Sequence, residues 1–182
     1  MPLNLLLDRI REKKVTIAIL GLGRVGLPLS SVLANAGFNV LGIDVDSKRL
    51  DSVRNSICPF FDPPLQENLK KSIDSGNLTV SNKIADTNVD VIILTVGTPS
   101  SQEGSVDYSQ LYTALNEVCL IELSNKIIIL RSTLPPKTTQ DIIIPFLEHK
   151  TNLKCGENFA LAVCPERILE GKAIKEIYDL PE

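Results

Sequence analysis

The sequence has few of the residues from which metal sites and disulfide frameworks are built. It contains four cysteines, one histidine and no tryptophan among 182 residues. Cys58, Cys119, Cys155 and Cys164 form no Cys-x-x-Cys pair, so neither a zinc site nor a disulfide framework is expected. We expect Cys119 and Cys164 to be small buried hydrophobic residues. His149 is expected at the surface, near the end of a helix.

Long apolar runs and a large excess of one charge are also absent. No run approaches the ~20 apolar residues that span a bilayer. The net charge of -3 gives no sign of a nucleic-acid or membrane partner. Residues 1–14 mix leucines with charges of both signs, which predicts a short leading amphipathic helix and not a signal peptide. Together these absences predict a cytoplasmic protein with no metal.

Apolar runs that alternate with amphipathic ones are the main positive feature, typical of a parallel sheet with crossover helices. The expected strands are 15–20, 39–44, 78–80, 89–96, 126–130 and 159–163. The expected helices are 25–36, 47–55, 65–75, 108–123, 135–148 and 169–178. The proline-rich segment 58–65 is expected to be a loop. The predicted fold is α/β, a Rossmann-type doubly wound, mainly parallel sheet with helices on both faces, as one domain over residues 1–182.

A glycine-rich turn lies between the first expected strand and the helix after it. Its residues are Gly21, Leu22, Gly23, Arg24, Val25 and Gly26. In such a turn the first glycine permits a tight bend, the second lets the backbone approach a pyrophosphate, and the third allows close packing. The N–H groups and dipole of the helix N-terminus also favour phosphate. All six residues are therefore expected to bind a dinucleotide.

A carboxylate stands at the end of the second expected strand. Asp44 comes 18 residues after Gly26, where it would accept hydrogen bonds from ribose hydroxyls and repel a 2′-phosphate. This position favours NAD over NADP. Arg49 is expected to lie over the adenine face by a cation–π contact, or else to be a solvated helix residue. The alternative for the whole arrangement is a doubly wound domain with an unrelated ligand.

Five stretches together resemble one enzyme family, the nucleotide-sugar 6-dehydrogenases, which include the UDP-glucose and UDP-N-acetylmannosamine dehydrogenases. The stretches are IAILGLGRVGLPLSSVLANAGFNVLGIDVDSKRLDSV, SICPFFDPPL, TVGTPS, RSTLPPKT and CPERILEGKAIKEI. They follow in the family's order and cover essentially the whole chain. The leading amphipathic helix is similar to that of the N-acetylmannosamine branch.

The resemblance implies an enzyme that oxidises a sugar C6 alcohol to a carboxylate by two hydride transfers to NAD, through a cysteine thioester that water cleaves. It implies NAD contacts at Thr98, Ser132, Thr133 and Glu170. It implies catalytic roles for Thr133 and Glu166, and substrate contacts at Glu166, Arg167 and Ile168. Simpler interpretations are a turn residue at Thr98, a helix cap at Thr133, a solvated Glu166 and a surface ion pair at Arg167.

The substrate branch is suggested by Pro165-Glu166-Arg167. This run is similar to the N-acetylhexosamine branch, whereas the UDP-glucose branch usually has an aromatic residue after Pro-Glu. Arg24 in place of a common tyrosine, and Glu170 in place of a common proline, depart from the family pattern. The alternatives are a UDP-glucose or UDP-N-acetylglucosamine dehydrogenase, or a non-catalytic nucleotide-binding module.

Several parts of the family are not found in this sequence. We find neither its catalytic cysteine motif, similar to G-F-G-G-x-C, nor the long dimerising helix, nor the UDP-binding domain. We therefore expect the 182 residues to be an NAD-binding domain that is inactive alone. The resemblance implies that the full-length protein is a homodimer or larger and acts on a UDP-sugar in polysaccharide biosynthesis.

Overall fold

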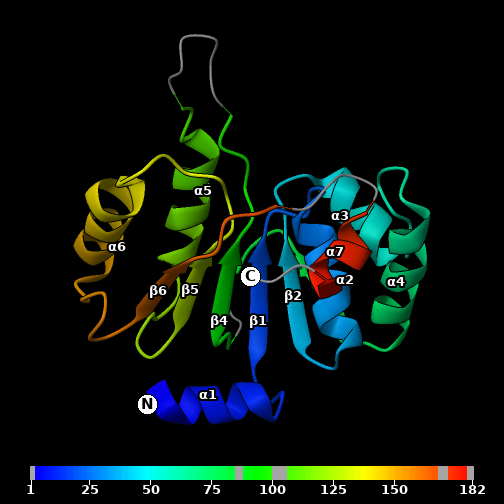
Figure 1. Ribbon diagram of the computed structural model, residues 1–182, viewed down its shortest axis with the longest axis horizontal. Coiled ribbons are helices and arrows are strands. Elements are labelled where there is room, and N and C mark those ends of the chain that lie inside the picture. The colour runs from blue at the N-terminus through cyan, green and yellow to red at the C-terminus, as the bar shows by residue number, and fades with distance from the viewer. Residues whose placement is uncertain (1–2, 85–87, 100–105, 168–171, 180–182) are drawn as a thin grey trace.

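The centre of the molecule is a six-stranded sheet in which every pair of neighbouring strands is parallel (Figure 1). The computed structural model describes residues 3–84, 88–99, 106–167 and 172–179. The strands are β1 Thr16–Leu20, β2 Asn39–Ile43, β3 Leu78–Ser81, β4 Val91–Leu94, β5 Ile127–Leu130 and β6 Ala160–Val163. Their order, β3-β2-β1-β4-β5-β6, reverses between β1 and β4. The expected Rossmann-type fold is confirmed, and such a reversal places a ligand crevice at the carboxyl ends of the strands.

Helices cover both faces of the sheet and one of its ends. They are α1 Leu3–Arg11, α2 Gly26–Asn35, α3 Ser47–Arg54, α4 Pro63–Asp74, α5 Ser109–Val118, the π-helical turn η1 Thr139–Ile143, α6 Ile144–Thr151 and α7 Ala173–Asp179. In Figure 1, α1 lies across the amino ends of the strands, and the connections at their carboxyl ends lie at the opposite edge. Among the described residues, no helix is long and apolar enough to cross a membrane.

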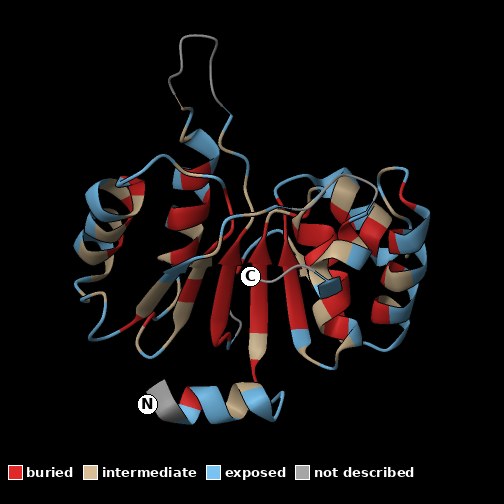
Figure 2. Ribbon diagram, viewed as in Figure 1, coloured by how far each residue is buried: buried red, intermediate tan, exposed pale blue. Residues whose placement is uncertain are grey.

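The central strands β1, β2 and β4 are apolar, apart from the first residues of β1 and β2, because each face of the sheet packs against helices. In β1, Ile17 and Ile19 belong to a core shared with α2, α3 and α4, whereas Ala18 and Leu20 belong to a second core shared with α5 and α6. Successive side chains of a strand point to opposite faces, so an uninterrupted apolar run fills both cores. Figure 2 shows the resulting burial in β1, β2 and β4.

The leading helix α1 is held against the amino edge of the sheet by apolar packing and by an ion pair. Leu6 is buried in the core with α2. Arg9 donates to both carboxylate oxygens of Asp90, at 2.6 and 2.9 Å, and Asp90 also accepts from the Thr16 backbone N–H at 3.0 Å. A helix therefore forms within residues 1–14, where the sequence predicted one, and it packs against the sheet.

The helix expected at residues 65–75 begins two residues earlier. Asp62 caps α4 by accepting a hydrogen bond from the Leu65 backbone N–H at 3.1 Å, and Pro63 opens the helix. The loop expected over 58–65 therefore ends at Asp62. Proline fits a first turn because the N–H group it lacks has no partner there.

The helix expected at residues 135–148 begins later and is irregular. Lys137 has a left-handed φ of 69°, which interrupts any helix starting at Pro135. The chain then forms the wide turn η1 before α6. Pro145 accounts for this widening, since it has no N–H for an α-helical bond and its ring crowds the carbonyl four residues earlier.

The burial expected for Cys119 and Cys164 was wrong. Both are half-buried, and Cys164 follows β6, whose last two residues are exposed. The reason for Cys164 is topological, because β6 is the edge strand of the sheet and its apolar pattern alone does not reveal that position. The expected position of His149 is confirmed, since it is exposed in the last turn of α6.

Replacing Asp90 by alanine is expected to lower the free energy of unfolding by about 2–4 kcal/mol. The change removes three hydrogen bonds and leaves the Arg9 guanidinium without its partner at a partly buried site. Urea denaturation measures the effect. Asp74→Ala is the control, because its ion pair with Lys70 is exposed and should contribute less than about 0.5 kcal/mol. Equal losses in the two variants would contradict this assignment.

Candidate functional site

Two cavities lie at the carboxyl ends of the strands. The first has a volume of about 290 Å³ and is lined by the glycine turn, the end of β2 and one side of α5. The second is lined by the segments that follow β4, β5 and β6. Both include Thr95, Val96, Gly97 and Gln110, so they meet at the end of β4. Among the described residues, no group of three or more histidine, cysteine or acidic side chains could hold a metal ion.

The three glycines of the turn occupy different environments. Gly21 has a left-handed φ of 98°, a conformation that glycine adopts without strain. A Cβ on Gly26 would overlap the Gly21 carbonyl oxygen and meet the Thr95 hydroxyl. A Cβ on Gly23 would meet nothing within 4 Å, and Gly23 lines the first cavity. The backbone is thus open to a ligand at Gly23 and closely packed at Gly26.

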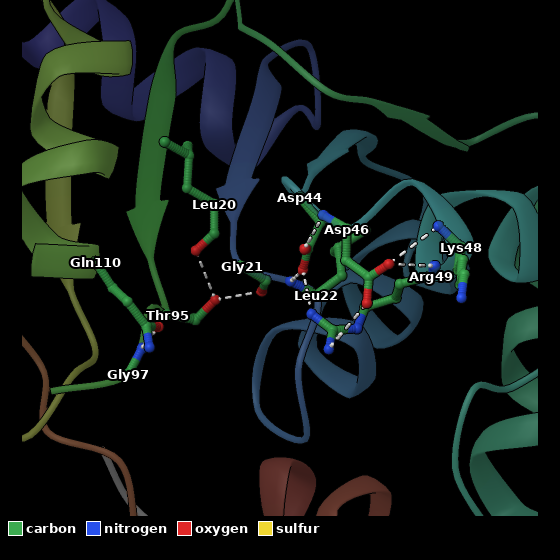
Figure 3. Close-up of polar contacts among 10 residues, drawn as sticks. All are labelled: Leu20, Gly21, Leu22, Asp44, Asp46, Lys48, Arg49, Thr95, Gly97 and Gln110. Carbon is green, nitrogen blue, oxygen red and sulfur yellow. Dashed lines mark hydrogen bonds and ion pairs between the residues drawn. The ribbon is translucent and has the colours of Figure 1, made fainter. Parts of the chain in front are cut away.

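The carboxylate of Asp44 joins the glycine turn to the start of α3 (Figure 3). One oxygen accepts from the Leu22 N–H at 2.7 Å and from the Arg49 guanidinium at 2.8 Å, and the other accepts from the Asp46 N–H at 2.9 Å. The Asp44 side chain is only 4% exposed, yet it lines the first cavity. The geometry therefore places this carboxylate at the wall of the first cavity, and its contact with a ribose stays a prediction.

Three other predicted residues of this region have different environments. Arg49 lines the first cavity but is paired with Asp44 and lies 3.7 Å from Asp46. The Leu22 side chain is fully buried in the core with α2, so only its backbone belongs to the site. Arg24 is exposed, with its guanidinium 5.0 Å from the centre of the Phe60 ring.

The second cavity brings together residues from separate segments. Val25, Thr98, Ser132, Thr133 and Glu166 all line it. The Thr98 hydroxyl donates to the Thr133 carbonyl at 2.7 Å, and the Ser132 hydroxyl donates to the Val96 carbonyl at 2.5 Å. These bonds tie the segment after β4 to the segment after β5, so the predicted residues form one group.

Glu166 is held by a buried cation that the sequence reasoning missed. Arg131 donates to one Glu166 carboxylate oxygen from Nε at 3.1 Å and from Nη2 at 2.6 Å. The two side chains are 7% and 12% exposed. The other oxygen accepts from the Arg167 N–H at 2.7 Å. Glu166 is therefore oriented at the wall of the cavity and is not the solvated glutamate of the simpler interpretation.

Of the other predicted substrate and cofactor residues after Glu166, only Arg167 lies in the described part of the chain. Arg167 is exposed and lines neither cavity. Ile168 and Glu170 lie outside the described residues, so their predicted contacts stay predictions.

Further residues of the site were missed because their role depends on contacts across the fold. Gln110 accepts from the Gly97 N–H at 3.2 Å, and Glu117 accepts from the Ile84 N–H at 2.5 Å. Both lie on α5 and line the first cavity. Their spacing of seven residues on one helix face was the available signal, but it also suits an ordinary solvated face.

Three of the four cysteines do not provide an activated thiolate here. Burial raises the pKa of the Cys58, Cys119 and Cys155 thiols above the usual value, and a thiolate is the reactive form. The Cys164 sulfur accepts a hydrogen bond from Arg131 at 3.5 Å. Cys164 does not line either cavity.

Comparisons with known proteins agree with this geometry. The chain is 34% identical over 170 residues to the GDP-mannose 6-dehydrogenase of Pseudomonas savastanoi pv. phaseolicola, covering 91% of the chain and 39% of that relative. It is 33% identical to the UDP-N-acetyl-D-mannosamine dehydrogenase of Methanococcus aeolicus, covering 95% of the chain and 39% of that relative. The chain thus spans about two fifths of the length of these relatives.

A solved structure and a family description extend the match. The ternary complex of GDP-mannose dehydrogenase from Pseudomonas aeruginosa superposes with a TM-score of 0.85 at 34% identity, covering 91% of this chain and 39% of that one. The NAD-binding domain of the UDP-glucose/GDP-mannose dehydrogenase family matches residues 15–182. The strand order, the glycine turn and the acceptor at Asp44 suit this cofactor. The chain belongs to the UDP-glucose/GDP-mannose dehydrogenase family and contains its NAD-binding domain.

Proposed function

We propose that this chain is the NAD-binding part of a UDP-N-acetyl-D-mannosamine-type 6-dehydrogenase, which oxidises the sugar C6 alcohol to a carboxylate with two NAD. The observation that carries the proposal is the meeting of two cavities at the end of β4. One contains the glycine turn and Asp44, and the other contains Thr133 and Glu166. A cofactor and a second reactant would then lie side by side, as hydride transfer requires.

The chain's own groups divide between the two tasks. Gly23 admits the pyrophosphate to the backbone, and Asp44 accepts hydrogen bonds from the adenosine ribose. NAD, when bound, would accept the hydride. Thr133 and Glu166 contact the reacting end, where Glu166, held by Arg131, orients the water that cleaves the acyl intermediate. The family resemblance assigns Arg167 and Ile168 to the sugar nucleotide and Glu170 to the cofactor, and these three assignments stay predictions.

The identity of the sugar rests on Pro165-Glu166-Arg167, the run that is similar to the N-acetylhexosamine branch. GDP-mannose is the second candidate, because relatives named for it and for UDP-N-acetylmannosamine are equally similar, at 34% and 33–34% identity. UDP-glucose and UDP-N-acetylglucosamine stay as alternatives. A non-catalytic nucleotide-binding module is less favoured, because such a module has no need for Glu166 held by a buried arginine.

We further propose that residues 1–182 form one domain and do not complete the reaction alone, since none of the described cysteines lines either cavity. The measurement is NADH formation from UDP-N-acetylmannosamine, UDP-glucose and GDP-mannose, with the full-length Pseudomonas savastanoi enzyme as the positive control for GDP-mannose. We expect NAD binding without turnover. Sustained NADH formation by the 182 residues would contradict the proposal, and Cys164→Ser would then test Cys164 as the nucleophile.

The proposal that the full-length protein is an enzyme is tested by reading the gene in frame beyond the codon for Glu182. A continuation that contains a cysteine motif similar to G-F-G-G-x-C would support a dehydrogenase, and substrate profiling of that longer product would identify the sugar. A natural protein that ends at Glu182 would support the alternative of a non-catalytic nucleotide-binding module.

Asp44→Ala is expected to weaken NAD binding by about 1–3 kcal/mol, because hydrogen bonds that involve a charged acceptor are lost. The preference for NAD over NADP should also fall, since the carboxylate that repels a 2′-phosphate is removed while Arg49 stays nearby. Calorimetric titration with both cofactors measures the two effects. Asp51→Ala is the control, because its ion pair with Arg54 on the same helix is exposed. Equal or tighter binding of NADP by the unaltered chain would disprove the role of Asp44.

Gly23→Val and Gly26→Val are expected to fail in different ways. A side chain at Gly23 meets no neighbouring atom, so the variant should fold and lose NAD binding. A side chain at Gly26 overlaps the turn itself, so that variant should lose stability as well. Thermal denaturation followed by circular dichroism, together with NAD titration, separates the two results. Normal NAD binding by Gly23→Val would mean that the cofactor binds elsewhere.

A further inference from the structure

The hydroxyl of Thr95 contacts the glycine turn from the neighbouring strand. Thr95 directly follows β4, and its Oγ1 lies 2.7 Å from the Gly21 carbonyl oxygen and 3.0 Å from the Leu20 carbonyl oxygen (Figure 3). A hydroxyl has one proton to donate, and the shorter contact is to Gly21. The Leu20 carbonyl also accepts a hydrogen bond from the Thr95 backbone N–H at 2.9 Å. Leu20 therefore has a donor without the Thr95 side chain, whereas the Gly21 carbonyl depends on the hydroxyl.

The peptide group between Gly21 and Leu22 is therefore held at both ends. Its carbonyl accepts from Thr95, and its N–H donates to Asp44 at 2.7 Å. The Gly21 N–H before it donates to the Ile43 carbonyl at 2.8 Å. This peptide cannot rotate without breaking two hydrogen bonds, one on the side of β4 and one on the side of β2.

The orientation of this peptide matters for an anionic ligand. A rotation of the peptide would release its carbonyl oxygen from Thr95 and turn the negative end of its dipole toward the first cavity, which Gly21, Gly23 and Asp44 line. A carbonyl oxygen there would repel a pyrophosphate, whereas backbone N–H groups at a helix N-terminus attract it. Glycine has little conformational barrier of its own to such a rotation, so the restraint has to come from neighbouring groups.

We propose that Thr95 is a positioning residue for the cofactor, which keeps the Gly21 carbonyl away from the pyrophosphate through the hydrogen bond from its hydroxyl. Gly26 leaves the space that the Thr95 hydroxyl occupies, because a Cβ at position 26 would lie 2.5 Å from the Thr95 Oγ1. Thr95 also lines both cavities. One side chain thus aligns the turn at the junction of the two halves of the site.

The test compares Thr95→Val, which keeps the shape and removes the hydroxyl, with Thr95→Ser, which keeps the hydroxyl. NAD, ADP-ribose and adenosine are titrated by calorimetry or ligand-observed NMR. We expect Thr95→Val to weaken NAD and ADP-ribose about tenfold, in the range for an unsatisfied polar group. Adenosine, which has no pyrophosphate, should bind as before. Thr95→Ser should bind NAD within about threefold of the unaltered chain. Thr79→Val, on β3, is the matched control, because its hydroxyl makes a long contact with the Val40 carbonyl, at 3.5 Å, and lines neither cavity.

Three results would overturn the inference. They are unchanged NAD affinity in Thr95→Val, an equal loss for adenosine and NAD, and a Thr95→Ser variant as weak as Thr95→Val. The inference rests on NAD binding at this turn, which titration of the unaltered chain tests separately. Failure of that titration would count against the site, whereas failure of the variant comparison alone would count against Thr95.

Discussion

The site depends on the buried carboxylate of Asp44 and the hydrogen bonds it accepts. A buried carboxylate has to be satisfied by donors, and here the donors come from the glycine turn, from the segment after β2 and from α3. The proposed ribose acceptor and the proposed pyrophosphate turn are therefore joined by the same side chain. The distance between these two parts of a dinucleotide site is set before any ligand arrives.

The parallel sheet determines where such groups can gather. All carboxyl ends meet at one edge, and several of the strands are followed there by a polar residue that lines one of the two cavities. Examples are Asp44 after β2, Thr95 after β4, Arg131 after β5 and Glu166 shortly after β6. The two apolar cores hold the strands rigidly from both faces, so hydrogen bonds between the segments, such as Thr98 to Thr133, join already fixed positions.

Much of the fold could be predicted from the sequence, and the errors in that prediction have physical causes. Each strand lies within two residues of its expected place, because a doubly covered parallel strand needs an unbroken apolar run. The predicted starts of α4 and α6 were wrong. Pro63 opens α4, whereas Pro145 widens the turn before α6, and the residues around each proline decide which effect occurs. The exposure at the end of β6 was also missed, because edge and central strands can have the same pattern of residues.

The sequence by itself determined the strand–turn–helix unit, the spacing from Gly26 to Asp44 and hence the cofactor, because these are local features with a fixed register. Only the tertiary structure decided that Thr95 holds the Gly21 carbonyl, that Arg131 holds Glu166, and that Leu22 contributes its backbone alone. The Thr95 and Arg131 contacts join residues 74 and 35 positions apart. No local pattern specifies such pairs, since they arise from the strand order that places β4 beside β1 and β6 beside β5.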